Sequence, residues 1–181
     1  LSGGADSTFV GLIADELGKT IHSVSFHLFE QNSWDFNTAK STSEKLGWNF
    51  HEVVVPTHNP KEDFLELVQT YQCQKKTELE VLFPYIYLMQ KVKELGFDKV
   101  LTGFSSPLPD GRKNAIKIKN NNPLYWEEVI SADFDSSATA KCFEYSKAQN
   151  IKVEQPLNDR SVKELLVGKT WSDIHKPFWK S

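Results

Sequence analysis

The residues best suited to chemistry form the run Ser2-Gly3-Gly4-Ala5-Asp6-Ser7 near the start of the sequence. Two adjacent glycines allow backbone N–H groups to approach a ligand closely, because no side chain stands in the way. At the N-terminus of a helix such a turn leaves N–H donors unpaired, with the positive end of the helix dipole behind them. That arrangement suits a phosphate group. The same residues are also typical of a simple turn into a helix capped by Asp6 or Ser7, and chemistry alone leaves both interpretations open.

The segments that must position this run alternate between helix and strand. Apolar spacing and Gly, Pro or Asp punctuation predict helices over residues 7–17, 35–46, 61–71, 84–95, 136–149 and 160–167. Runs rich in β-branched and aromatic residues predict strands over 21–28, 50–55 and 99–102. Pro84 takes the first position of its helix, where proline is favoured, and Asp159 caps the last one.

This alternation predicts an α/β fold, a parallel sheet with helices on both faces, followed by a mostly helical C-terminal part. Ligands of such sheets bind at the carboxyl ends of the strands. We therefore expect the glycine run, the strand around Val24 and Phe26, and Thr102 with Gly103 to border one crevice.

The bulk composition excludes several classes of protein. A chain of 181 residues with 39% hydrophobic and 25% charged residues is typical of one globular domain. A formal net charge of −3 argues against nucleic acid as a partner. No apolar run approaches the ~20 residues of a membrane span. The two cysteines, Cys73 and Cys142, lack metal-ligand spacing and are interpreted as reduced thiols, which favours a cytoplasmic location.

Ser-Gly-Gly-x-Asp-Ser at residues 2–7 resembles the PP-loop of the N-type ATP pyrophosphatases, which cleave ATP between its α and β phosphates. Three later stretches, in the order found in that family, are similar to the synthetase domain of asparagine synthetase and β-lactam synthetase. They are Leu46-Gly47-Trp48-Asn49-Phe50-His51-Glu52-Val53, Val100-Leu101-Thr102-Gly103 and Pro156-Leu157-Asn158-Asp159-Arg160. The resemblance implies an adenine nucleotide α-hydrolase-like fold.

The resemblance also implies roles for matching positions. The phosphates of ATP would be held by Ser2, Gly3, Gly4, Ala5, Asp6 and Ser7, and its adenosine would be bordered by Val24, Phe26, Thr102 and Gly103. Asp6 would help to hold Mg²⁺. Lys176 stands where the family has a lysine that stabilises charge on the α-phosphate, so it is the candidate catalytic residue.

The sequence departs from the family directly after Gly103. The family has Glu-Gly-Ala-Asp-Glu there, whereas this chain has Phe104-Ser105-Ser106-Pro107-Leu108. No acidic residue remains at these positions, and Asp110 is the candidate replacement as a metal ligand. Because Mg²⁺ keeps several waters and needs few protein ligands, nucleotide binding is expected even so.

The chain is interpreted as one domain, residues 1–181. It has a nucleotide-binding α/β core over 1–103, a loop over 104–124 and a helical part over 125–181. The loop is basic, which fits either a surface loop or a flap that neutralises pyrophosphate. Since only Leu1 precedes the glycine run and a phosphate loop follows a strand, we expect a fragment of a longer protein whose first strand is missing here.

The resulting hypothesis is an ATP-dependent ligase that forms AMP and pyrophosphate. It would adenylate a small-molecule carboxylate or amide for attack by an amine or ammonia. A glutaminase domain, upstream or in trans, supplies ammonia in the amidotransferase members. Two alternatives stay open: a catalytically degenerate nucleotide-binding module, and a nucleobase- or tRNA-modifying PP-loop enzyme, which would be expected to show a basic face or zinc-binding cysteines.

Overall fold

The computed structural model describes residues 1–28, 33–56, 60–104, 137–165 and 167. The chain divides into two compact units. The described residues of the first unit are 1–28, 33–56, 60–104 and 137–155, and those of the second are 156–165 and 167. The predicted boundaries at residues 103 and 124 are not tested by this division and stay a prediction, as does the single domain. Asp110, Lys176 and the basic loop lie outside the described residues.

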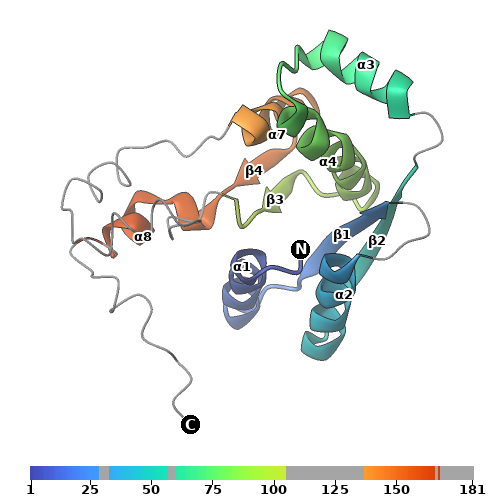
Figure 1. The fold of residues 1–181 in the computed structure, drawn as a ribbon. Helices are drawn as coiled ribbons and strands as arrows, with labels where there is room; N and C mark the ends of the chain where they lie inside the picture. The colour runs from blue at the N-terminus through green and yellow to red at the C-terminus, as the bar shows by residue number, and fades with distance from the viewer. Residues whose placement is uncertain (29–32, 57–59, 105–136, 166, 168–181) are drawn as a thin grey trace. The chain divides into compact units, whose positions relative to one another are not determined.

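Helices and strands alternate through the first unit, as Figure 1 shows. In chain order they are α1 (Ala5–Glu16), β1 (His22–Leu28), α2 (Trp34–Leu46), β2 (Asn49–Val55), α3 (Pro60–Tyr71), α4 (Lys76–Glu94), β3 (Lys99–Leu101), α7 (Ser137–Ala148) and β4 (Lys152–Glu154). The strands form two two-stranded parallel sheets, β1 with β2 and β3 with β4. The predicted α/β class with parallel strands is therefore confirmed.

Helices cover both faces of the β1–β2 sheet, because α2 and α4 each contact both strands. Side chains alternate along β1 accordingly. Val24 and Phe26 pack against the apolar core on the α4 side, while the buried Ser23 and His27 contact α2. The two faces of this strand thus differ in chemistry, one apolar and one polar.

The hydrophobic core lies on the α4 side of the sheet. It consists of buried side chains from β2, α3, α4 and α7 with their connections: Val53, Val55, Leu67, Cys73, Leu82, Phe83, Tyr85, Met89, Val92, Cys142, Tyr145 and Ile151. A buried hydrogen bond crosses it, joining the Tyr85 and Ser146 hydroxyls at 2.8 Å. No helix among the described residues has the length and apolar character that a membrane span requires.

On the other face, Trp48 fixes α1. Its indole Nε1 donates to the Asp15 carboxylate at 2.9 Å. Its ring also lies so close to Gly11 that a Cβ there would come within 2.5 Å of it. A side chain at the start of β2 therefore holds the helix that carries the glycine run.

The prediction that a helix starts at Pro84 is wrong, because α4 begins eight residues earlier, at Lys76. The Glu78 carboxylate accepts hydrogen bonds from the backbone N–H groups of Gln74 and Lys75, at 2.7 and 3.2 Å, and so caps the helix. Pro84 lies in the helix interior, where it is buried between Phe83 and Tyr85. Burial of this apolar face offsets the cost of a proline in mid-helix.

The described part of the second unit contains a short 3-10 helix, Pro156–Asn158, and α8 (Arg160–Glu164). The Asp159 carboxylate accepts from the Ser161 N–H at 2.9 Å, so the predicted cap is confirmed, although α8 ends before residue 167. The strand β4 in the first unit was not predicted, since three residues carry too little periodicity to show it.

The Tyr85–Ser146 hydrogen bond gives a test of the core. Tyr85 and Ser146 are only 4% and 1% exposed. Tyr85→Phe leaves the Ser146 hydroxyl buried without its partner, so we expect the free energy of unfolding to fall by about 1–2 kcal/mol in urea denaturation. Ser146→Ala in the Tyr85→Phe background should cost much less than Ser146→Ala alone. Tyr87→Phe is the control, and an equal loss there would contradict the assignment.

Candidate functional site

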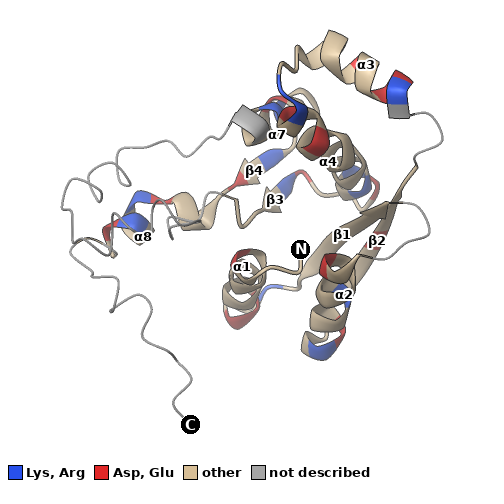
Figure 2. Cartoon of the chain, viewed as in Figure 1, with Lys and Arg blue, Asp and Glu red and all other residues tan. Residues whose placement is uncertain are grey.

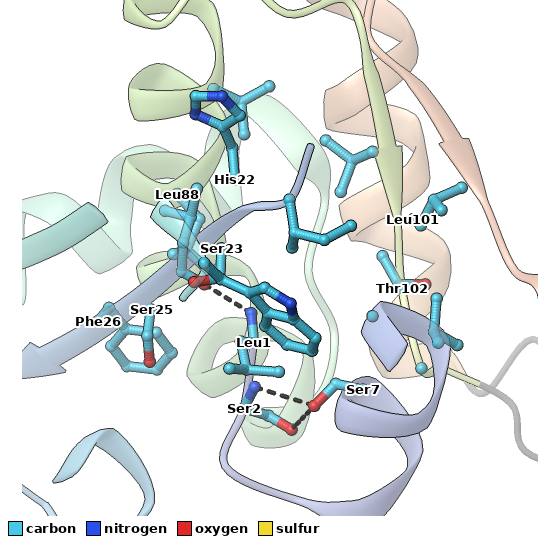
Figure 3. Close-up of a pocket in the computed structure, with 18 of the residues that line it drawn as sticks. Leu1, Ser2, Ser7, His22, Ser23, Ser25, Phe26, Leu88, Leu101 and Thr102 are labelled. Carbon is cyan, nitrogen blue, oxygen red and sulfur yellow. Dashed lines mark hydrogen bonds between the residues drawn. The ribbon is translucent and has the colours of Figure 1, made fainter. Parts of the chain in front are cut away.

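The glycine run forms the turn into α1, with Gly4 as the N-cap residue. No side chain caps the helix, so neither Asp6 nor Ser7 plays the capping role that the simpler interpretation required. Instead the Ser7 hydroxyl accepts from the Ser2 N–H at 3.1 Å and contacts the Ser2 hydroxyl at 2.9 Å (Figure 3). The turn is thus braced across its base, while the first N–H groups of α1 are left without a side-chain acceptor.

Two glycines hold this turn between neighbouring elements. Gly3 has a φ of +75°, and a Cβ there would lie 2.3 Å from the backbone oxygen of Asp35 in the first turn of α2. A Cβ on Gly103, just after β3, would lie 2.5 Å from the backbone nitrogen of Ser7. Only glycine fits either position without a shift of backbone. The starts of α1 and α2 and the end of β3 therefore meet at one place.

A cavity of about 1070 Å³ runs along β1 and β3 and reaches this meeting point at one end. It brings together most of the predicted nucleotide-binding residues, namely Ser2, Gly4, Asp6, Ser7, Val24, Phe26, Thr102 and Gly103. Gly3 and Ala5 belong to the same turn but do not line the cavity. Figure 3 shows Ser2 and Ser7 at one end, with Thr102 and the β1 residues around it. The roles of these residues stay predictions, as do those of Asp110 and Lys176.

Backbone hydrogen bonds fix the two strands that border the cavity. The Thr102 N–H donates to the Glu154 carbonyl at 2.9 Å, so pairing with β4 continues past the end of β3. The Leu1 nitrogen donates to the Val24 carbonyl at 2.6 Å. The cavity wall is therefore built largely on ordered backbone.

Two buried polar atoms in the wall have no partner among the described residues. They are the Thr102 Oγ1 and the His27 Nδ1. His27 is only 6% exposed. Buried polar atoms are nearly always hydrogen-bonded in folded proteins, so each of these calls for an explanation. A polar ligand in the cavity would supply one.

The sequence analysis missed Ser25 and His27. A strand covered by helices on both faces is normally apolar throughout, so the alternation of Ser23, Ser25 and His27 was the available signal. Ser23 is satisfied by the Ser43 hydroxyl of α2 at 2.8 Å. Nearer the carboxyl end of the strand, the buried polar side chains are not fully hydrogen-bonded to described residues. This end is where such sheets bind ligands.

His27 is held in a defined orientation. Its Nε2 lies 2.9 Å from the Glu52 carboxylate, and its ring meets the edge of Phe36 with centroids 4.7 Å apart. The Glu52 carboxylate lies 3.9 Å from the Lys40 ammonium. A carboxylate can only accept, so Nε2 carries the proton and Nδ1 is left as an acceptor in the neutral ring.

Two exposed carboxylates, Asp6 and Asp35, line the cavity in the first turns of α1 and α2 (Figure 2 colours acidic residues red). Neither makes an ion pair or hydrogen bond with any residue that the structure describes. Within the described ranges, no three or more His, Cys, Asp or Glu side chains are grouped to hold a metal ion. Cys73 and Cys142 are buried and form no disulfide, and burial raises the pKa of both thiols, that of Cys142 to about 12, which disfavours the reactive thiolate form.

A model of one protein family, asparagine synthase, matches residues 1–106 of the sequence. The matched region contains the glycine turn, β1, β2, β3 and Gly103, and with them the whole lining of the cavity. No curated protein matches the chain.

The contact at Gly103 gives a prediction for the site. Gly103→Ala places a methyl group against the backbone of Asp6 and Ser7, so we expect a loss of about 1–3 kcal/mol in the free energy of unfolding. Because the strain falls on the first turn of α1, amide hydrogens there should exchange faster in the variant.

Gly96→Ala is the control for this experiment. It strains a left-handed residue with open space around it, at the end of α4 and away from the residues that hold α1. It should lower stability without changing amide exchange at the start of α1. Unchanged exchange in Gly103→Ala would show that the contact does not hold the turn.

Proposed function

This chain belongs to the asparagine synthase family, and we propose that it is an ATP-dependent ligase that forms AMP and pyrophosphate. An ATP-dependent, synthetase-like function follows from the family in general terms. The adenylation reaction and the residues that carry it are our proposal. The observation that supports it best is the cavity itself, where the uncapped turn into α1 meets polar groups that no described residue satisfies.

The turn suits the phosphates of ATP. No side chain among the described residues accepts a hydrogen bond from the first N–H groups of α1, and the helix dipole favours negative charge at this end. The Ser2 and Ser7 hydroxyls lie at the same place and could donate to phosphate oxygens. The absence of side chains at Gly3 and Gly103 lets neighbouring backbone approach closely, which keeps these donors in position.

The adenosine would lie across the carboxyl ends of β1 and β3, bordered by Val24, Phe26, Thr102 and Gly103. The Thr102 Oγ1 is buried without a partner among the described residues, so a ribose hydroxyl or base nitrogen would satisfy it.

The proposed reaction has two steps. An oxygen of the substrate carboxylate attacks the α-phosphorus, the bond to the bridging oxygen breaks, and pyrophosphate leaves with the bonding electrons. An amine or ammonia then attacks the acyl carbon, AMP leaves, and the nitrogen loses a proton. Fixed positive groups stabilise the negative charge that develops on the phosphoryl oxygens. Lys176 is our candidate for this role.

The residues at the turn also fit Mg²⁺. Asp6 is an exposed carboxylate beside the expected phosphates, and oxygen ligands are what this ion prefers. When bound, the ion would neutralise part of the phosphate charge. Asp6 would then hold one side of the ion, with phosphate oxygens and water on the others.

Pyrophosphate release tests this function. We expect the protein to release pyrophosphate from ATP with Mg²⁺ when a panel of carboxylates is supplied with ammonia or amines. Asp6→Asn should lower the rate at least about tenfold, since it removes a charge that holds the ion near the phosphates. Glu16→Gln, on the same helix outside the cavity, should leave the rate unchanged. No release with any acceptor, and equal nucleotide binding by Asp6→Asn, would overturn the proposal.

A second candidate is a nucleotide-binding module that has lost catalysis, and the placement of Phe104 favours it. The family has an acidic residue at this position, whereas here the ring packs against the core, with centroids 6.4 Å from Tyr85 and 6.3 Å from Phe143.

Calorimetry beside the rate assay separates the two candidates. A binding module would take up ATP or AMP with micromolar or better affinity yet release no pyrophosphate with any acceptor. Measured turnover in the same preparation would exclude it.

A further inference from the structure

We propose that Asp35, in the first turn of α2, supplies the second carboxylate for the Mg²⁺ that accompanies ATP in this cavity. This inference rests on the proposed function. It assigns a metal-binding role to a residue outside the phosphate turn, on an element that carries no part of the predicted site.

The backbone places Asp35 beside the turn. A Cβ atom added to Gly3 would lie 2.3 Å from the carbonyl oxygen of Asp35 and 3.1 Å from the α-carbon of Asp35. The Asp35 side chain therefore starts within a few ångströms of the phosphate turn. Asp35 and Asp6 are both exposed, and both line the same cavity.

The two carboxylates need a cation once ATP is bound. Neither has an ion-pair or hydrogen-bond partner in the described ranges. Two carboxylates beside a polyphosphate weaken its binding, because they repel the negatively charged phosphates even in partly solvated surroundings. A divalent ion between them converts that repulsion into attraction.

His27 is an independent observation that points to the same ligand. It is 6% exposed and lines the cavity, and its ring packs on Phe36, the residue that follows Asp35. Its Nε2 lies against the Glu52 carboxylate, and its buried Nδ1 has no partner among the described residues, so in the neutral ring Nδ1 can accept a hydrogen bond. Mg²⁺ keeps several waters when it binds protein, and each of these waters needs acceptors for its hydrogens. His27 supplies one, as a positioning residue rather than a direct ligand.

The described residues contain no preformed cluster of three metal-ligating side chains. Two carboxylates on separate helices are too few to hold Mg²⁺ alone, but they suffice when phosphate oxygens complete the coordination. The ion is thus expected to bind together with the nucleotide and only weakly without it.

Calorimetry with a non-hydrolysable ATP analogue tests the role of Asp35. In excess Mg²⁺, Asp35→Asn should bind the analogue about tenfold more weakly than the unchanged protein. In EDTA the same variant should bind it more tightly, because a repelling charge is gone. Asp35→Glu keeps the charge and should resemble the unchanged protein in both conditions. Glu16→Gln should show no change.

The opposite signs separate a metal ligand from a structural residue. The Asp35 carbonyl that touches Gly3 is retained in Asp35→Asn, and damage to the turn would weaken binding in both conditions. Weaker binding in both, or equal binding in both, would overturn the role of Asp35 while leaving the proposed function intact. No binding of the analogue by the unchanged protein in either condition would overturn both.

Manganese provides a readout free of nucleotide chemistry. Electron paramagnetic resonance should show little bound Mn²⁺ with the protein alone and clear binding when the analogue is added. Asp35→Asn should weaken this second signal. Tight Mn²⁺ binding without nucleotide, unchanged in Asp35→Asn, would also overturn the proposal.

Discussion

The site depends on two close backbone contacts that are possible only because one residue in each contact is a glycine. Gly103 lies against the backbone of Asp6 and Ser7, and Gly3 lies against the backbone of Asp35. Any Cβ at either position would enter the van der Waals shell of a backbone atom, which cannot give way as a flexible side chain can. These two contacts bring the starts of α1 and α2 to the end of β3. They make a single cavity of elements that are far apart along the chain.

The β1–β2 sheet divides its two tasks between its faces. On one face, Val24 and Phe26 join the apolar core beneath α4, so the strand is anchored by hydrophobic burial. On the other face, Ser23 is satisfied by α2, but the buried Nδ1 of His27 has no partner among the described residues. The cost of burying polar groups is thus concentrated near the carboxyl end of the strand, where a bound ligand can recover it.

Local signals in the sequence predicted most of the elements. Gly47 ends α2 in the left-handed conformation that its type suggests, and the motif at residues 2–7 predicted the turn that opens onto the cavity. Pro84 led to a wrong prediction of the helix start. Burial of its helix face outweighs the preference of proline for the first turn of a helix. The polar alternation along β1 was a signal for Ser25 and His27 that the sequence analysis did not use. Asp35 could not be predicted as a candidate site residue, since its position beside the turn arises only when α2 touches Gly3.

Phe104 links the departure in sequence to the arrangement of charge. An acidic side chain at this position would follow Gly103 directly and reach the phosphates, but the phenyl ring instead packs beside Tyr85 and Phe143. A carboxylate cannot take that place without a large cost of desolvation. If this position serves the core, a second acidic ligand for the proposed Mg²⁺ has to come from another element that meets the turn. The first turn of α2 meets it at Gly3 and carries Asp35. In our proposal, core packing and phosphate binding are thus assigned to different residues.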